Sequence, residues 1–240
     1  MTIPLAAAGI RAVLFDAVGT LIYPRPSVAV AYTAAGRHCG SRRGADEVAA
    51  RFRAALAAGE HARRTHEAWQ TSEAAERQLW RAIVDHVFDD VADREPLFAA
   101  LWEHFARPQH WALYDDVAGA WQALAGAGLQ VALASNFDSR LHAVCEGLPP
   151  LDRCARRYVS SEVGFRKPGP AFFRAVERSL ELEPRQILLV GDDWENDVLG
   201  GSRAGWRVAW LDRGGPAPLG PPPAGAVRLG GLAELLDLRL

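Results

Sequence analysis

Side chains able to do chemistry follow three short apolar runs of this sequence. Asp16 follows the first run, Ser135 and Asn136 follow the second, and Asp192 follows the third. Among 27 basic residues the chain has one lysine, Lys167. The compact, strongly hydrated ammonium of lysine is a point charge, and the planar guanidinium of arginine would not substitute for it at that position. We interpret these residues as parts of one site.

The apolar runs predict the elements that must position those side chains. Residues 11–15, 129–134, 186–190 and 207–211 are rich in Val, Leu and Ala, and helical stretches separate them. Such runs are typical of parallel strands buried on both faces, so the expected fold class is α/β. Ligands of open parallel sheets bind beyond the carboxyl ends of the strands, so the polar groups should converge on one crevice.

The acidic residues of this crevice favour a divalent cation. The segment after the third run, GDDWEND, contains Asp192 and Asp197. Like charges so close together repel each other unless a cation lies among them, and oxygen ligands suit Mg²⁺. The structural alternatives are a turn-forming role for Asp16 and helix N-caps for Asp192 and Asp197. With Lys167 added, the crevice would receive a dianionic phosphate.

Four motifs in order resemble the haloacid dehalogenase superfamily of hydrolases. They are FDAVGTL around Asp16, ALASN ending at Asn136, FRKPGPAFF around Lys167, and GDDWEND. The resemblance spans nearly the whole chain. It implies a doubly wound parallel sheet of Rossmann type with an inserted α-helical cap, formed by residues 1–22 and 114–240 as the core and 23–113 as the cap.

The resemblance also implies roles for the residues at the metal. Asp16 would be the nucleophile that takes the phosphoryl group and forms an aspartyl phosphate. Mg²⁺ would be held by Asp16, Asp192 and the backbone carbonyl of Val18, with Asp197 supporting the metal shell.

A second group of residues would hold the substrate phosphate in such a family member. These are Lys167, Ser135 and Asn136, together with the hydroxyl of Thr20 from the first motif. The implied substrate is a small phosphorylated molecule.

Val18 departs from the phosphatase pattern, which has a second aspartate there as general acid and base. Loss of that group costs roughly 10²- to 10⁴-fold in rate on poor leaving groups. Three readings remain open. One is a phosphatase in which Asp138 or a cap residue moves the proton. Another is a 2-haloacid dehalogenase that binds the substrate carboxylate through Arg42 or Arg43. The third is a non-catalytic binding protein.

Residues 27–107 have the composition of a helical insert, with helical spacing from Trp69 through Arg77 to Trp80. We assign no role to His61, His66 and His110. We note Tyr23 and Arg25 only for their place directly after the first motif, where the chain enters the cap. Residues 214–225 predict a surface loop, 226–229 a short strand and 232–238 a closing amphipathic helix.

Composition excludes several classes of function. A formal net charge of −2 with scattered arginines argues against nucleic-acid binding, and the 240 residues contain 49% apolar residues, enough for a large core. No apolar stretch is long enough to span a bilayer, and the first residues lack the basic start of a signal peptide. The cysteines, Cys39, Cys145 and Cys154, lack metal-ligand spacing, so we expect reduced thiols in a cytoplasmic protein.

Overall fold

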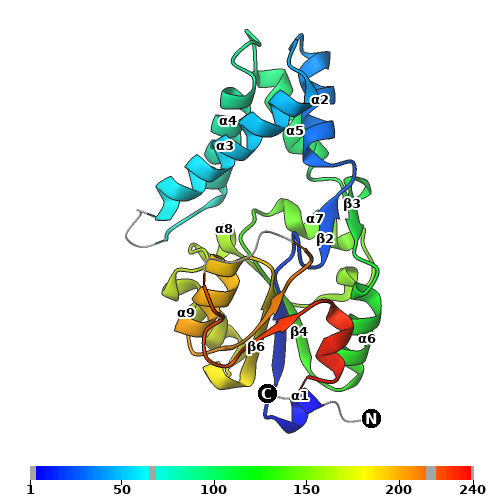
Figure 1. Cartoon of the computed structure of the whole chain (residues 1–240), viewed down its shortest axis with the longest axis vertical. Helices are drawn as coiled ribbons and strands as arrows, with labels where there is room; N and C mark the ends of the chain where they lie inside the picture. Colours follow the sequence, from blue (N-terminus) through cyan, green and yellow to red (C-terminus); the bar gives the residue numbers. More distant parts are fainter. Residues whose placement is uncertain (1–3, 65–68, 215–219, 239–240) are drawn as a thin grey trace.

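The protein is built on a six-stranded parallel sheet, as the sequence predicts (Figure 1). The structure is a computed structural model, and it describes residues 4–64, 69–214 and 220–238. The strand order is β5-β4-β1-β6-β7-β8. The strands are β1 (Ala12–Phe15), β4 (Gln130–Ser135), β5 (Arg157–Val159), β6 (Ile187–Gly191), β7 (Arg207–Leu211) and β8 (Ala226–Leu229).

Both faces of this sheet are buried, which explains why its strands read as continuous apolar runs. Successive side chains of β1 point to opposite faces. Val13 and Phe15 belong to one hydrophobic cluster, whereas Ala12 and Leu14 belong to another. The confirmed α/β class therefore rests on a core in two layers, one on each side of the sheet.

Helices cover the two faces. The first cluster includes buried residues of α6 (Val117–Gly126), α7 (Arg140–Glu146) and the 3₁₀ helix η5 (Leu232–Leu236), and the second includes residues of α9 (Pro170–Leu180). The remaining helices of this part are α1 (Pro4–Ala7), α8 (Ser160–Val163), α10 (Gly200–Arg203), the 3₁₀ helices η1 (Pro108–His110), η2 (Leu151–Arg153) and η3 (Pro184–Gln186), and the π-helix η4 (Trp194–Leu199).

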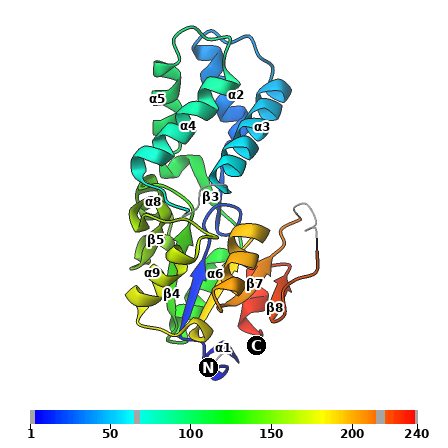
Figure 2. The same ribbon diagram turned by 90° about the vertical axis from the view of Figure 1, so that its left-hand side faces the viewer.

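Four of the helices between β1 and β4 form a separate group, which we call the helical insert. They are α2 (Val28–His38), α3 (Ala45–Arg64), α4 (Glu73–Val87) and α5 (Glu95–His104). These helices bury their own hydrophobic cluster, which includes Tyr32, Phe88 and Phe98. Figures 1 and 2 show the insert above the sheet, beyond the carboxyl ends of its strands.

A two-stranded antiparallel ribbon connects the insert to the sheet. It pairs β2 (Ile22–Pro24) with β3 (Trp111–Leu113), so the chain leaves and returns side by side. The boundaries expected from the sequence, after residue 22 and before residue 114, correspond to the first residue of β2 and the end of β3 and stay a prediction. No helix of the described residues is long and apolar enough to cross a membrane.

Two predictions of local structure are wrong. Trp69 does not continue the helical spacing: its φ is +53°, and α4 begins only at Glu73, where the Ser72 hydroxyl accepts a hydrogen bond from the amide of Ala75. The closing helix expected over 232–238 is a shorter 3₁₀ helix, η5, which still buries Leu232 and Leu235. The predicted loop at 214–225 lies partly outside the described residues, and the strand after it is β8.

Candidate active site at the carboxyl end of the sheet

The carboxyl ends of three neighbouring strands open into one cavity. Asp16 follows β1, Ser135 ends β4, and Asp192 follows β6. The chain order reverses at β1, which has β4 on one side and β6 on the other, and this is where open parallel sheets bind ligands. The cavity has a volume of about 320 Å³. The site residues expected from the sequence that line it are Asp16, Val18, Ser135, Asn136, Lys167, Asp192 and Asp197.

Lys167 lies at the centre of the charged groups. Its side chain is 1% exposed, and its Nζ donates to Asp16 Oδ1 at 2.9 Å and to Asp197 Oδ1. Burial alone lowers the pKa of Lys167, but the carboxylates of Asp16 and Asp197 outweigh it and raise that pKa above its usual value. The ammonium is therefore charged at neutral pH and neutralises part of an acidic cluster.

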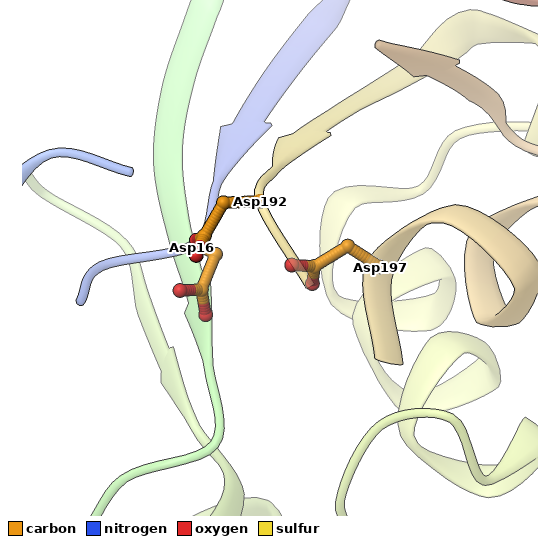
Figure 3. Close-up of side chains that lie close together, drawn as sticks. All are labelled: Asp16, Asp192 and Asp197. Atoms are coloured by element: carbon orange, nitrogen blue, oxygen red, sulfur yellow. The ribbon is translucent and has the colours of Figure 1, made fainter. Parts of the chain in front are cut away.

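Three carboxylates converge from two segments of the chain, one after β1 and one after β6. Figure 3 shows Asp16, Asp192 and Asp197 close together, and each offers an oxygen within 4.8 Å of the other two. Burial, followed by the negative charge of Asp16, raises the pKa of Asp192 to about 6. Burial likewise raises the pKa of Asp197, against the opposing effect of Lys167. In both residues burial is the largest cause of the shift and the charge of Asp16 adds to it, so a cation nearby would favour the ionised carboxylates.

Two glycines make this close approach possible. A Cβ atom at Gly19 would lie 2.3 Å from Asp192 Oδ2, and Gly19 also has a φ of +90°. A Cβ at Gly191 would lie 2.2 Å from Asp197 Oδ2. Any side chain at either position would therefore displace a carboxylate of the cluster.

Thr20 has a different role from the one expected. Its hydroxyl donates to Asp192 Oδ1 at 2.7 Å and accepts from the Asp192 amide at 3.1 Å. Thr20 is fully buried and is not among the residues that line the cavity. The assignment of Thr20 to phosphate binding is therefore corrected, because its hydroxyl is already used to hold Asp192 in place.

Asn136 likewise uses its side chain for positioning. Its Nδ2 donates to the Lys167 carbonyl at 2.9 Å, and its Oδ1 accepts from the Lys167 amide at 2.9 Å. This pair of bonds ties the end of β4 to the segment that carries the lysine. The N-cap role, which was the structural alternative for Asp192 and Asp197, belongs instead to Asp193, which accepts from two amides at the start of η4.

The acidic cluster fits a divalent cation. Asp16, Asp192 and Asp197 provide hard oxygen ligands, which Mg²⁺ prefers. Lys167 supplies one positive charge against the three, so a metal ion would neutralise what remains. Asp197 already accepts from Lys167 and, through Oδ2, from the Asp193 amide at 3.2 Å. Its position suits an outer support of the metal better than a direct ligand.

The helical insert contributes charged residues that the sequence did not single out. Glu60 on α3 and Glu76 on α4 line the cavity, as do Arg63 on α3 and Arg166 beside Lys167. Glu60 pairs with Arg166 at 2.8 Å, and Glu76 pairs with Arg63 at 3.0 Å. In a chain so rich in arginine no signal marks these residues, although Arg166 is the immediate neighbour of the single lysine.

Several candidates from the sequence are engaged elsewhere. Asp138 is fully buried and forms two 2.7 Å hydrogen bonds with Arg140, so it is not available to replace the missing proton carrier. Arg43, considered for a substrate carboxylate, pairs instead with Glu47, Asp89 and Asp90. The other candidates that do not line the cavity are Arg42, Tyr23, Arg25, His61 and His110, and His66 lies outside the described residues.

Comparison with known proteins identifies the family. The family model of haloacid dehalogenase-like hydrolases matches residues 10–205. The chain is 26% identical to haloacid dehalogenase-like hydrolase domain-containing protein 3 of Bos taurus over 149 residues, which cover 60% of this chain and 59% of that protein. The chain thus matches about three-fifths of the length of that relative.

Solved structures show the same fold. An L-2-haloacid dehalogenase of Xanthobacter autotrophicus has a TM-score of 0.69 and 20% identity, with 94% of this chain and 96% of that chain covered. A haloacid dehalogenase superfamily phosphatase of Thermococcus onnurineus has a TM-score of 0.65 and 22% identity, with 94% and 96% covered. The chain belongs to the haloacid dehalogenase-like hydrolases, and its fold alone does not separate dehalogenase from phosphatase chemistry.

Proposed function

We propose that the protein is a Mg²⁺-dependent phosphohydrolase that acts on a small phosphorylated molecule through an aspartyl phosphate on Asp16. One observation carries this proposal: carboxylates from Asp16, Asp192 and Asp197 meet within 4.8 Å on a cavity that Lys167 also lines. A cluster with this excess of negative charge calls for a divalent cation, and the cation together with the ammonium suits a phosphate dianion.

The nucleophile would be the carboxylate of Asp16. Lys167 holds its Oδ1, which leaves Oδ2 to attack phosphorus. A bond forms between Oδ2 and phosphorus while the bond from phosphorus to the leaving oxygen breaks. Water then attacks phosphorus, the bond to Asp16 breaks, and inorganic phosphate leaves with the carboxylate restored.

Charge stabilisation would come from groups already in place. Lys167 and the Ser135 hydroxyl would hold the phosphoryl oxygens, since both line the cavity beside Asp16. Mg²⁺, when held by Asp16, Asp192 and the Val18 carbonyl, would neutralise charge on the transferring group. Thr20 would orient Asp192 through its two hydrogen bonds.

The helical insert would act as a cap over this site. Leu56 and Glu60 on α3 and Trp80 on α4 line the cavity together with the residues at the sheet, so residues 23–113 would exclude water from the reacting groups. Because Val18 has no proton to give, we expect preference for leaving groups that depart as stable anions, such as aryl oxides or carboxylates.

A second candidate, dehalogenation of a 2-haloacid, has one observation in its favour. Val18 also lines an adjoining cavity of about 250 Å³ whose walls include Tyr32 and Phe52, an apolar environment that suits a haloalkyl group. The carboxylate cluster at Asp192 and Asp197 weighs against this candidate, since displacement of halide by Asp16 needs no cation. Halide release from a 2-haloacid without metal would establish it.

The test is phosphate release from p-nitrophenyl phosphate with Mg²⁺ and with a chelator. We expect turnover only with metal, loss of turnover in Asp16→Asn, and a strong reduction in Lys167→Arg, since the guanidinium is too large for a side chain that is 1% exposed. Arg174→Gln, on the exposed face of α9, is the matched control and should behave as wild type. The proposal would be refuted if turnover persisted in the presence of the chelator or in the Asp16→Asn variant.

A further inference from the structure

Arg166 is a buried arginine with unused hydrogen-bond donors. Its side chain is 4% exposed, and Glu60 occupies only one of its nitrogens: both Glu60 oxygens accept from Nη2, at 2.9 and 2.8 Å. Nε and Nη1 are buried and have no hydrogen-bond partner among the described residues. Native proteins pair nearly all such groups, so unpaired donors on a charged side chain indicate a missing partner.

The missing partner would lie in the active-site cavity. Arg166 lines that cavity with Lys167, its neighbour in sequence, so the two Cα atoms are about 3.8 Å apart. Lys167 contacts the carboxylates at the sheet, whereas Arg166 contacts Glu60 on the helical insert. A cavity of about 320 Å³ is at the small end of ligand-binding sites and holds a ligand larger than a phosphate group alone.

We propose that Arg166 is a binding subsite for a second anionic group of the substrate, a carboxylate or a second phosphate, in addition to the phosphoryl group at Asp16. The inference rests on the proposed function and narrows its substrate class to phosphate esters with two anionic groups. Guanidinium groups bind carboxylate and phosphate oxygens through strong charge-assisted hydrogen bonds. Nε and Nη1 provide such donors without displacing Glu60 from Nη2.

The charge around this subsite is compatible with an anion. Each of the two glutamates that line this part of the cavity is paired with an arginine: Glu60 with Arg166, and Glu76 with Arg63. Glu76 also accepts from the Thr71 hydroxyl at 2.6 Å. The two ion pairs therefore carry no net charge, and an incoming carboxylate or phosphate meets a guanidinium of which two nitrogens are unpaired among the described residues.

Arg166 also joins the insert to the sheet domain, which is the competing explanation. Its amide donates to the Trp69 carbonyl at 3.0 Å, and its side chain pairs with Glu60 across the same junction. If the side chain served only to hold the insert closed, loss of either partner of the ion pair would have the same effect. Glu60→Gln breaks the ion pair and keeps the guanidinium, so it separates the two explanations.

The experiment is calorimetric titration of the Asp16→Asn protein with Mg²⁺ present, which measures binding without turnover. The ligands are glycerol 3-phosphate, 3-phosphoglycerate and glycerol 1,3-bisphosphate, which carry no second anion, a carboxylate and a second phosphate respectively. We expect one or both of the probes with a second anionic group to bind about tenfold or more tightly than glycerol 3-phosphate, given the usual strength of hydrogen bonds to charged groups. The probe that binds more tightly than glycerol 3-phosphate identifies the second anionic group as a carboxylate or a phosphate.

Variants test whether Arg166 is the residue that binds the second anionic group. Arg166→Gln should abolish the gain, Arg166→Lys should keep part of it, and Glu60→Gln should keep or increase it, while Arg174→Gln changes nothing. Equal affinity for all three probes, or binding of none of them, would overturn the subsite, whereas the proposed function is decided separately by phosphate release from p-nitrophenyl phosphate in the wild type. Equal losses for every probe in Arg166→Gln and Glu60→Gln would show a closing contact only.

Discussion

The substitution Val18→Asp tests whether a general acid and base is missing at position 18 of the candidate active site. Val18 lies two residues after Asp16, lines the same cavity and is 37% exposed. An aspartate there would reach solvent and the cavity, so it would not be a buried charge without partners. Loss of the partial burial of the valine costs less than about 2 kcal/mol, so the variant should fold.

The expected gain depends on the leaving group. A general acid contributes roughly 10²- to 10⁴-fold, which corresponds to about 2.7–5.5 kcal/mol of barrier. An alkyl oxide needs that proton, whereas p-nitrophenolate leaves without it. Hydrolysis of glycerol 3-phosphate should therefore rise by about that factor in Val18→Asp, and hydrolysis of p-nitrophenyl phosphate should change little.

The assay is kcat/KM for both esters with Mg²⁺, for wild type, Val18→Asp and Val18→Asn. Val18→Asn matches the size and polarity of the aspartate but transfers no proton, so it should resemble wild type. The reasoning is refuted if the ratio of alkyl to aryl hydrolysis is the same in all three proteins, or if Val18→Asn gains as much as Val18→Asp.

Burial and close approach at Lys167, Gly19 and Cys145 can each be tested by substitution. Lys167→Met should lower the free energy of unfolding by about 3–5 kcal/mol, measured in urea without metal, because Asp16 and Asp197 lose their buried partner. Gly19→Ala should weaken Mg²⁺ binding in calorimetry, since its Cβ would lie 2.3 Å from Asp192 Oδ2; unchanged affinity would contradict that geometry. Burial raises the pKa of the Cys145 thiol from 9.0 to about 12. The folded protein then retains a proton that the unfolded chain releases, so thermal stability should fall as pH rises from about 9 to 12, and Cys145→Ser should reduce that slope.

Local patterns sufficed for much of the fold. The apolar runs predicted β1, β4, β6 and β7 to within a residue at each end, because a strand buried on both faces must be apolar throughout. Prediction failed where tertiary contacts override local spacing. Trp69 has helical spacing to Glu73, but the chain is not helical at Trp69, and its backbone carbonyl accepts from the amide of Arg166.

Sequence alone also indicated which residue types meet at the strand ends, since parallel strands bring their carboxyl ends to one edge whatever the loops between them do. Only the tertiary structure decided how each side chain is used. Thr20 and Asn136 have the chemistry to bind phosphate, yet their hydrogen bonds are spent on Asp192 and on the Lys167 backbone. That outcome depends on which groups lie opposite across 172 and 31 residues of chain.

The charged residues that the helical insert contributes to the cavity could be identified only from the tertiary structure. Glu60 and Arg166 are 106 residues apart, and an arginine in this chain is too common to mark a site by its type. The sequence predicted an α/β hydrolase with a candidate nucleophile, acidic residues and one lysine at the sheet edge. The packing of α3 against the segment before Lys167 decided what else faces the substrate, because ion pairs between distant elements depend on geometry that no local pattern encodes.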